Sequence, residues 1–164
     1  MAKANERLPS PEEYQAFLQG LELRHVRLIE LRVKTLDDNP KPADSIVSVE
    51  GDTEFAPTES GFEARTIYRV SFSERNSGQE LGTIEAIYGF RYESEVKPND
   101  EGAEAYFDIF SDVNMPVNSW PFMRELTYNM MARMGWTPFA LPLLKPPPPT
   151  PTKKTPAKRR KASG

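Results

Sequence analysis

Apolar and polar residues alternate most regularly in two stretches near the middle of the chain, residues 62–72 and 84–92. Such alternation predicts half-buried β-strands, because successive side chains of a strand point to opposite faces of a sheet. Asn76, Ser77 and Gly78 lie between the two stretches and are typical of a tight turn. The pattern therefore predicts an antiparallel hairpin with one apolar face.

The first part of the chain predicts a short helix followed by a strand. Ser10 can cap a helix that begins at Pro11 and stops at Gly20. From residue 21 the apolar residues alternate in two phases, and the change of phase near residues 25–28 indicates a bulge or twist in one strand. A helix that continues through this stretch is the alternative, because the same residues also fit helical spacing.

Other segments complete the predicted sheet. Residues 37–42 have turn chemistry, residues 45–49 predict a short strand, and residues 55–61 predict a loop. Residues 96–104 form a predicted polar loop, which is followed by an aromatic cluster at residues 106–110.

Residues 118–134 predict an amphipathic helix with a marked start and end. Asn118 or Ser119 can cap its first amides, Pro121 suits its opening turn, and Gly135 suits the left-handed position after its last turn. The order helix, four strands, helix predicts an α+β fold. We expect a four-stranded antiparallel sheet with a long C-terminal helix packed on it.

The length and charge of the chain indicate one domain with unlike ends. Its 164 residues fit a domain at 11–144, flanked by predicted disordered segments at 1–10 and 145–164. The last segment carries seven of the 21 Lys and Arg and no acid, so residues 1–144 have a net charge of −10. It begins with Lys145 and four prolines, which favour extended polyproline II. Its later basic residues are Lys153, Lys154, Lys158, Arg159, Arg160 and Lys161.

The composition gives little support to catalysis. His25 is the single histidine and cysteine is absent, so a zinc site or a thiol nucleophile has no basis in the sequence. No Gly-rich phosphate loop is present. We therefore predict a protein that is not an enzyme and uses no cofactor or metal. The lack of cysteine, of a signal sequence and of a long apolar run predicts a cytoplasmic protein without a transmembrane segment.

One segment of 27 residues, 118–144, combines three short motifs. These are Trp-Pro-aromatic-x-Arg-Glu, then Arg-Met-Gly-x-x-Pro, then Leu-Pro-x-Leu. The combination resembles the C-terminal region of the SecB-like chaperones, the family of the bacterial export chaperone SecB and of relatives tied to toxin–antitoxin systems. The matching residues are Trp120, Pro121, Phe122, Arg124, Glu125, Gly135, Pro138, Leu141, Pro142 and Leu144.

The resemblance implies a function and an assembly. SecB-like proteins bind unfolded or nascent polypeptides without ATP, pair their sheets into dimers, and stack dimers through the long helices into tetramers. The chain departs from the family after Leu144, where SecB continues into a second helix that covers part of its peptide groove. Four prolines at 146–149 exclude that helix here, so SecB's C-terminal contacts with the export motor are not carried over.

Methionine and aromatic residues around the C-terminal helix predict a surface that accepts many sequences, although a plain core face is the alternative. We predict that six of them and the neighbouring Ile109 contact a client: Tyr106, Phe107, Ile109, Phe110, Met115, Trp136 and Phe139. The helix residues predicted for the core and for assembly are Trp120, Phe122, Met123, Leu126, Met130 and Met134.

The leading hypothesis is an ATP-independent holdase for unfolded or nascent polypeptides, with protein export as one role and a homodimer or homotetramer as its assembly. Free sheet edges could pair with another copy or with a client strand. One alternative is a dedicated chaperone of a single partner such as an antitoxin. Another is a nucleic-acid-associated adaptor, whose basic tail would bind phosphates weakly and with strong salt dependence.

Overall fold

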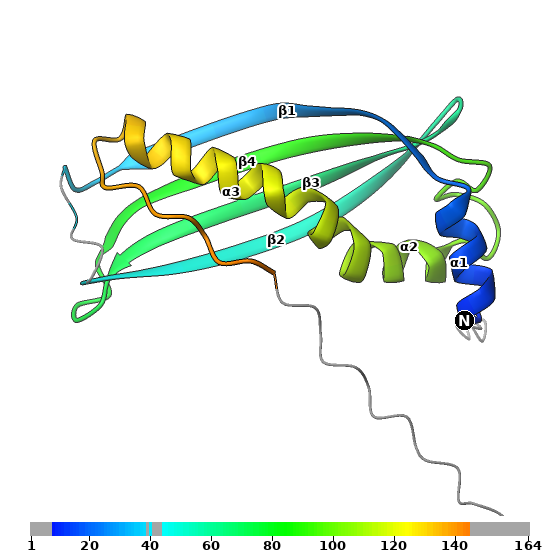
Figure 1. Ribbon diagram of the computed structural model, residues 1–164, viewed down its shortest axis with the longest axis horizontal. Helices are drawn as coiled ribbons and strands as arrows, with labels where there is room; N and C mark the ends of the chain where they lie inside the picture. The colour runs from blue at the N-terminus through cyan, green and yellow to red at the C-terminus, as the bar shows by residue number, and fades with distance from the viewer. Residues whose placement is uncertain (1–7, 39, 41–43, 145–164) are drawn as a thin grey trace, which may run out of the picture.

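Four long antiparallel strands form the sheet of this protein, and a nearly continuous run of helical residues crosses one face of it (Figure 1). The computed structural model describes residues 8–38, 40 and 44–144. The predicted basic tail and most of the predicted disordered N-terminus lie outside these residues. The elements in chain order are α1 (Pro11–Gln19), β1 (Glu22–Thr35), β2 (Ser45–Thr58), β3 (Gly61–Glu74), β4 (Glu80–Glu93), α2 (Glu104–Ile109), η2 (Phe110–Asn114) and α3 (Met115–Arg133).

The strands lie in the order β1-β4-β3-β2, so β1 and β2 form the two edges. Every neighbouring pair is antiparallel, which confirms the predicted α+β class with its four-stranded antiparallel sheet and packed C-terminal helix. On β3 and β4 the alternate residues facing α3 are buried, for example Val70 and its partner Ile84. The core therefore lies between the two central strands and the helical run.

The start of the chain follows the predicted helix and strand. Ser10 accepts a hydrogen bond from the Glu13 amide, and the Glu13 carboxylate accepts one from the Ser10 amide, which forms a complete capping box. β1 is a single strand, so the alternative of a continued helix is wrong. Its pairing with β4 shifts register twice, between Leu23 and His25 and between Leu28 and Glu30. Two bulges therefore bracket the segment where one was predicted.

β2 is much longer than predicted. The sequence predicted a strand at 45–49 and a loop at 55–61, whereas β2 pairs with β3 without interruption from Ser45 to Thr58. Gly51 and Asp52 weaken strand propensity locally, which made this stretch look broken. In the structure the ring of Tyr68, the cross-strand partner of Gly51, lies over the glycine and would be 2.7 Å from an added Cβ. The aromatic ring supplies the packing that the glycine lacks.

The C-terminal helical run begins earlier than predicted. Asn118 and Ser119 are not caps, because α2, η2 and α3 follow one another from residue 104. η2 is a π-helical stretch in which the Met115 amide bonds the carbonyl of Phe110, five residues back, directly before Pro116. Pro121, predicted for the first turn, lies inside α3. Because proline usually marks a helix start, the sequence placed the boundary too late.

Aromatic rings join the elements at one end of the sheet. Phe107 of α2 packs edge-on against Phe62, with ring centroids 4.9 Å apart, and against Phe55 at 5.0 Å. Phe17 of α1 contacts both Phe107 and Phe110. The short helices are thus fixed to β2 and β3 by rings, whose packing adds specific geometry to apolar burial.

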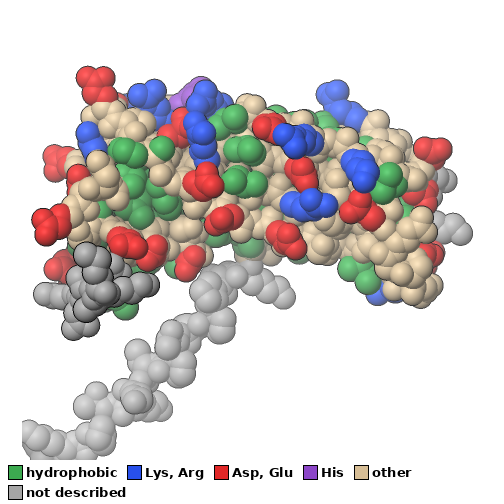
Figure 2. All heavy atoms as spheres, turned by 180° about the vertical axis from the view of Figure 1, so that it is seen from behind, with side chains coloured by type: hydrophobic (Ala, Val, Ile, Leu, Met, Phe, Trp, Pro, Cys, Tyr) green, Lys and Arg blue, Asp and Glu red, His purple; other side chains and the backbone are tan. Residues whose placement is uncertain are grey.

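The face of the sheet away from α3 carries many charged side chains, with apolar side chains between them (Figure 2). Ion pairs cross its strands, among them Arg27–Glu63 and Arg69–Glu85. Lys and Arg lie over the middle and the β1 side of this view, whereas acidic side chains gather toward the lower edge, where β2 lies. No helix in the described ranges is both long and apolar enough to cross a membrane.

Candidate functional site

The segment after α3 turns back along the helix that it follows (Figure 1). We call residues 136–144 the strap. Gly135 has φ +77°, as predicted for the position after the helix. The Gly135 amide donates to the carbonyl of Ala132 and the Trp136 amide donates to the carbonyl of Met131, which together form a Schellman motif. The sequence therefore sets the reversal that sends the strap back over the sheet.

Three side chains fix the strap by hydrogen bonds. The Trp136 indole N–H donates to the carbonyl of Asp37 at 2.9 Å, at the end of the sheet. Arg124 Nε donates to the carbonyl of Leu141 at 2.7 Å, and Trp120 Nε1 donates to the carbonyl of Pro142 at 2.8 Å. Both helix donors belong to the first sequence motif and both acceptors to the last. The motifs that looked separate in the sequence are thus bonded to each other.

The strap ends at a hollow beside the edge strand, which we call the β2–α3 groove. Its volume is about 480 Å³. β2 contributes Val49 and Thr53, the core contributes the edges of Tyr68 and Trp120, and the strap contributes Leu144. The Tyr68 hydroxyl bonds Ser119 Oγ at 2.7 Å, and Ser119 Oγ in turn donates to the carbonyl of Met115. Tyr68 is therefore the donor, and its burial raises the pKa of its hydroxyl.

The free edge of β2 borders this groove. The Thr53 amide donates to the carboxylate of Asp52 rather than to β3. Because backbone groups alternate in direction along a strand, the amides of Val49 and Gly51 point to the same free edge as that of Thr53. The side chains of Val49 and Thr53 face the groove. In the described structure β2 pairs with β3 alone. An extended polypeptide could therefore pair with this edge and place alternate side chains in the groove.

The groove is bordered by acidic residues. Asp52 and Asp112 are among its lining residues. No Lys or Arg occurs in residues 42–64, which include β2, or in residues 98–123, which include α2 and η2. Neither Asp52 nor Asp112 forms an ion pair among the residues that the structure describes. The local charge therefore favours a cationic or neutral occupant over an anionic one.

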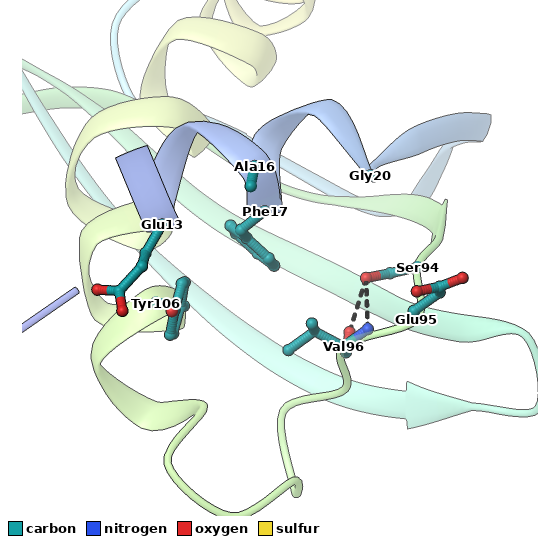
Figure 3. Close-up of a pocket in the computed structure, with 8 residues that line it drawn as sticks. All are labelled: Glu13, Ala16, Phe17, Gly20, Ser94, Glu95, Val96 and Tyr106. Atoms are coloured by element: carbon teal, nitrogen blue, oxygen red, sulfur yellow. Dashed lines mark hydrogen bonds between the residues drawn. The ribbon is translucent and has the colours of Figure 1, made fainter. Parts of the chain in front are cut away.

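A second hollow lies at the α1 end of the sheet and has a volume of about 560 Å³ (Figure 3). Phe17 and Tyr106 line one side, and Ser94 and Val96 line the other. Ser94 Oγ donates to the carbonyl of Val96 and accepts from its amide, which fixes this loop. The hollow borders no free strand edge, so it offers less to an extended chain than the groove does.

The predicted client residues fall into two groups. Phe107, Phe110, Met115 and Trp136 are all at most 5% exposed and belong to the core of the single chain. Three are half-buried: Tyr106, Ile109 and Phe139. Tyr106 lines the α1 hollow, whereas none of the seven lines the β2–α3 groove. The groove was missed because its walls come from Val49, Thr53 and Asp52, which ordinary strand patterning does not single out.

The predicted core and assembly residues of α3 also divide. Trp120 and Met123 are buried, and Phe122, Leu126, Met130 and Met134 are half-buried. The sequence analysis missed exposed apolar residues on the other side of the helical run: Val113, Val117 and Tyr128. It also missed those on the helix-facing side of edge strand β1: Leu23, Leu28 and Val33. Helical or alternating spacing of apolar residues in the sequence indicates an apolar face of a helix or strand. Only the folded structure shows which of these residues remain exposed.

His25 is exposed and lies opposite Arg91 on the sheet face away from α3. No group of three or more His, Asp or Glu side chains in the described residues could hold a metal ion. The basic residues of the tail, from Lys153 onward, lie outside the structure's described ranges.

Comparison with known proteins identifies the fold. No family model and no curated protein matches the sequence. Among solved structures, a SecB-like chaperone of Mycobacterium tuberculosis, in complex with a ChAD peptide from the HigA1 antitoxin, matches with a TM-score of 0.69. The two chains are 18% identical, and the match covers 82% of this chain and 98% of the other. The chain therefore has the SecB-like fold, as its C-terminal segment predicted.

Proposed function

We propose that this protein is an ATP-independent chaperone that binds unfolded polypeptide in extended form along the β2–α3 groove. The observation that carries the proposal is the bonding of Trp120 and Arg124 to the strap. These hydrogen bonds hold the strap beside the free edge of β2, and the groove lies between them on a SecB-like fold. We expect the protein to act in the cytoplasm, with protein export as one of its roles.

The free edge of β2 accounts for binding without sequence preference. Main-chain hydrogen bonds to the outward amides of Val49 and Gly51 would be the same for any extended chain. The groove beside them would take alternate apolar side chains. Asp52 already occupies the Thr53 amide, and carboxylates on an edge hinder uncontrolled strand pairing. A client would have to displace this contact, which favours reversible binding.

Assembly of several copies would lengthen the binding path. The sheet edge at β1 carries exposed Leu23, Leu28 and Val33, and α3 carries exposed Val117 and Tyr128. We propose that the chain pairs its sheets through β1 into dimers and stacks dimers through α3 into a tetramer, as the resemblance implies. A solution mass near four times 18.6 kDa is expected, whereas a monomer would contradict the assembly. Half-buried Phe122, Leu126, Met130 and Met134 would then become interior.

Suppression of aggregation tests the proposal. We expect the folded protein to keep a chemically unfolded client from scattering light at a stoichiometric ratio. Val49→Trp should fill the groove and reduce this protection. Ser48→Trp is the matched control, because Ser48 lies one residue away on the opposite face of β2. Equal protection by both variants would show that the client binds elsewhere, and absence of protection by the wild type would refute the function.

A second candidate is a dedicated chaperone of one partner. It is favoured by the similar structure from Mycobacterium tuberculosis, which was determined with a peptide from an antitoxin. The same groove would then serve a single extended segment. Protection of several unrelated unfolded proteins would argue against this alternative, whereas protection confined to an antitoxin encoded beside this chain would support it. The half-buried Tyr106, Ile109 and Phe139 remain proposed client contacts in either case.

A nucleic-acid adaptor role would depend on the tail. We expect deletion of residues 146–164 to abolish any nucleic-acid binding and to retain client binding, because the groove is built without them. Loss of client binding on this deletion would contradict the division between groove and tail.

A further inference from the structure

The described chain ends inside the β2–α3 groove. Leu144, its last described residue, lines the groove together with Ser111 and Asp112. Residues 145–164 follow directly and hold seven Lys and Arg and no acid. Because this segment is tethered at the groove itself, it meets the groove at an effective concentration of about 1 mM.

We propose that residues 145–164 dock in cis on the β2–α3 groove and the acidic helix surface beside it, and so compete with incoming polypeptide. The docking itself does not depend on what else the groove binds. The competition with a client rests on the proposed function.

Charge complementarity supports docking of this segment. Asp112, Asp108 and Glu104 recur at four-residue spacing on η2 and α2, which places them along one side of the helical run. This acidic stripe leads away from the groove, and no Lys or Arg interrupts residues 98–123. The nearby Arg124 already donates to the strap. A net negative surface therefore lies near Leu144, after which the most basic segment of the chain follows in the sequence.

The order of residue types in the tail matches the order of the groove and the acidic stripe: prolines come first and cations follow. Four prolines come first, at 146–149, and extended proline segments dock in grooves with aromatic walls such as those of Tyr68 and Trp120. The cations come later. Lys153 follows Leu144 by nine residues, which is about 28 Å of polyproline II. The acidic stripe is about 12 Å long at 1.5 Å per helical residue, so Lys153 and the cations after it can reach its far end.

Disulfide trapping tests the docking without any client. The sequence contains no cysteine, so two introduced cysteines form the only pair in the chain. One variant combines Thr152→Cys, directly before the first tail cation, with Ser111→Cys in the groove. The control combines Thr152→Cys with Ser48→Cys, which lies on β2 beside the groove but on the opposite face of the sheet. Both variants retain every acidic residue and every tail cation.

We expect the Ser111 pair to close an intramolecular disulfide about fivefold faster than the Ser48 pair at low salt, because docking raises the local concentration of the tail. The advantage should disappear in 1 M salt, where charges are screened beyond about 3 Å. It should also disappear when the six cations from Lys153 to Lys161 are changed to Gln. Equal rates at low salt, faster closure at Ser48, or mainly intermolecular disulfides would overturn docking in cis. Equal rates together with tight DNA binding by the tail would instead assign the tail to nucleic acid.

The effect on clients is a separate measurement. Truncation after Leu144 should raise the affinity for a labelled unfolded polypeptide about threefold to tenfold, as expected when a weak tethered competitor at about 1 mM is removed. The Gln-substituted tail should give the same rise. An unchanged or lower affinity would refute the competition. If neither form binds the polypeptide while the disulfide result holds, the proposed function fails and the docking stands.

Discussion

The bond from Arg124 to the strap gives a prediction that can be worked out from the structure. Arg124→Met retains an unbranched apolar stem, which preserves most of the packing along the helix, and removes the donor. The Leu141 carbonyl then loses a charge-assisted hydrogen bond of 2.7 Å beside a side chain that is 1% exposed. Hydrogen bonds to charged groups contribute about 1.5–3 kcal/mol, so we expect the free energy of unfolding to fall by that amount.

Urea unfolding at fixed protein concentration measures this change. The slope of the free energy against urea should stay constant, because the folded state keeps its compactness. Arg91→Met is the control, since Arg91 is exposed on the opposite sheet face and forms no ion pair in the described residues. Its effect should stay within about 0.5 kcal/mol. A loss for Arg124→Met that is no larger than the control would refute the role of this bond.

A double-mutant cycle with Trp120→Phe sharpens the test. Trp120 donates to the neighbouring carbonyl of Pro142, so both side chains hold the same stretch of strap. If one lost bond already loosens the strap, the second loss costs less. We therefore expect the double variant to lose at least about 0.5 kcal/mol less than the sum of the single variants. Strict additivity would mean that the two bonds hold the strap independently.

Three further predictions concern single side chains. Thr127→Val should stabilise the fold by about 1 kcal/mol in urea unfolding, because Thr127 Oγ1 is fully buried without a hydrogen-bond partner among the described residues; a destabilised variant would mean that the hydroxyl has a partner. Gly51→Ala should destabilise by about 1–3 kcal/mol, because the new methyl group would lie 2.7 Å from the Tyr68 ring; unchanged stability would show that the ring moves freely. Burial raises the pKa of Tyr14 to about 12 from an ordinary value of 10.0. Because the unfolded chain ionises first, the stability due to the neutral Tyr14 is complete below pH 10 and is lost as pH rises toward 12. Absorbance at 295 nm should show an ionisation near pH 12 that is missing in Tyr14→Phe, and an unchanged titration in the variant would contradict the assignment.

The sequence predicted the strands best where the alternation of apolar and polar residues matches the burial of those residues in the fold. β3 alternates between buried and more exposed residues along most of its length, because it faces the helix on one side and solvent on the other. β2 was cut short because its stability comes from a neighbour, the ring of Tyr68 over Gly51, and no local pattern carries such a contact. The start of the helical run was misplaced because Pro121, a residue type that usually lies in the first turn of a helix, lies inside α3.

The candidate site was predicted only in part, for a related reason. The motif residues Trp120, Arg124, Leu141 and Pro142 were recognised together, and the structure explains why they occur together: they bond each other. The groove beside these residues was not predicted. It is bordered by the unpaired edge of β2, and the order of the strands in the sheet, which the sequence pattern does not give, decides which edge is unpaired. The large aromatic residues attracted attention in the sequence, but rings such as Phe110 are used to join α1, α2 and η2 to the sheet.

Hydrogen exchange of the β2 amides with and without an unfolded client tests the central claim most directly. If the client pairs with the free edge, exchange should slow at the outward amides of Val49, Gly51 and Thr53, and the inward amides between them should change little. The sheet face around Ile67 should be unaffected. Slowing confined to that face or to the α1 hollow, with the β2 edge unchanged, would contradict binding in the β2–α3 groove.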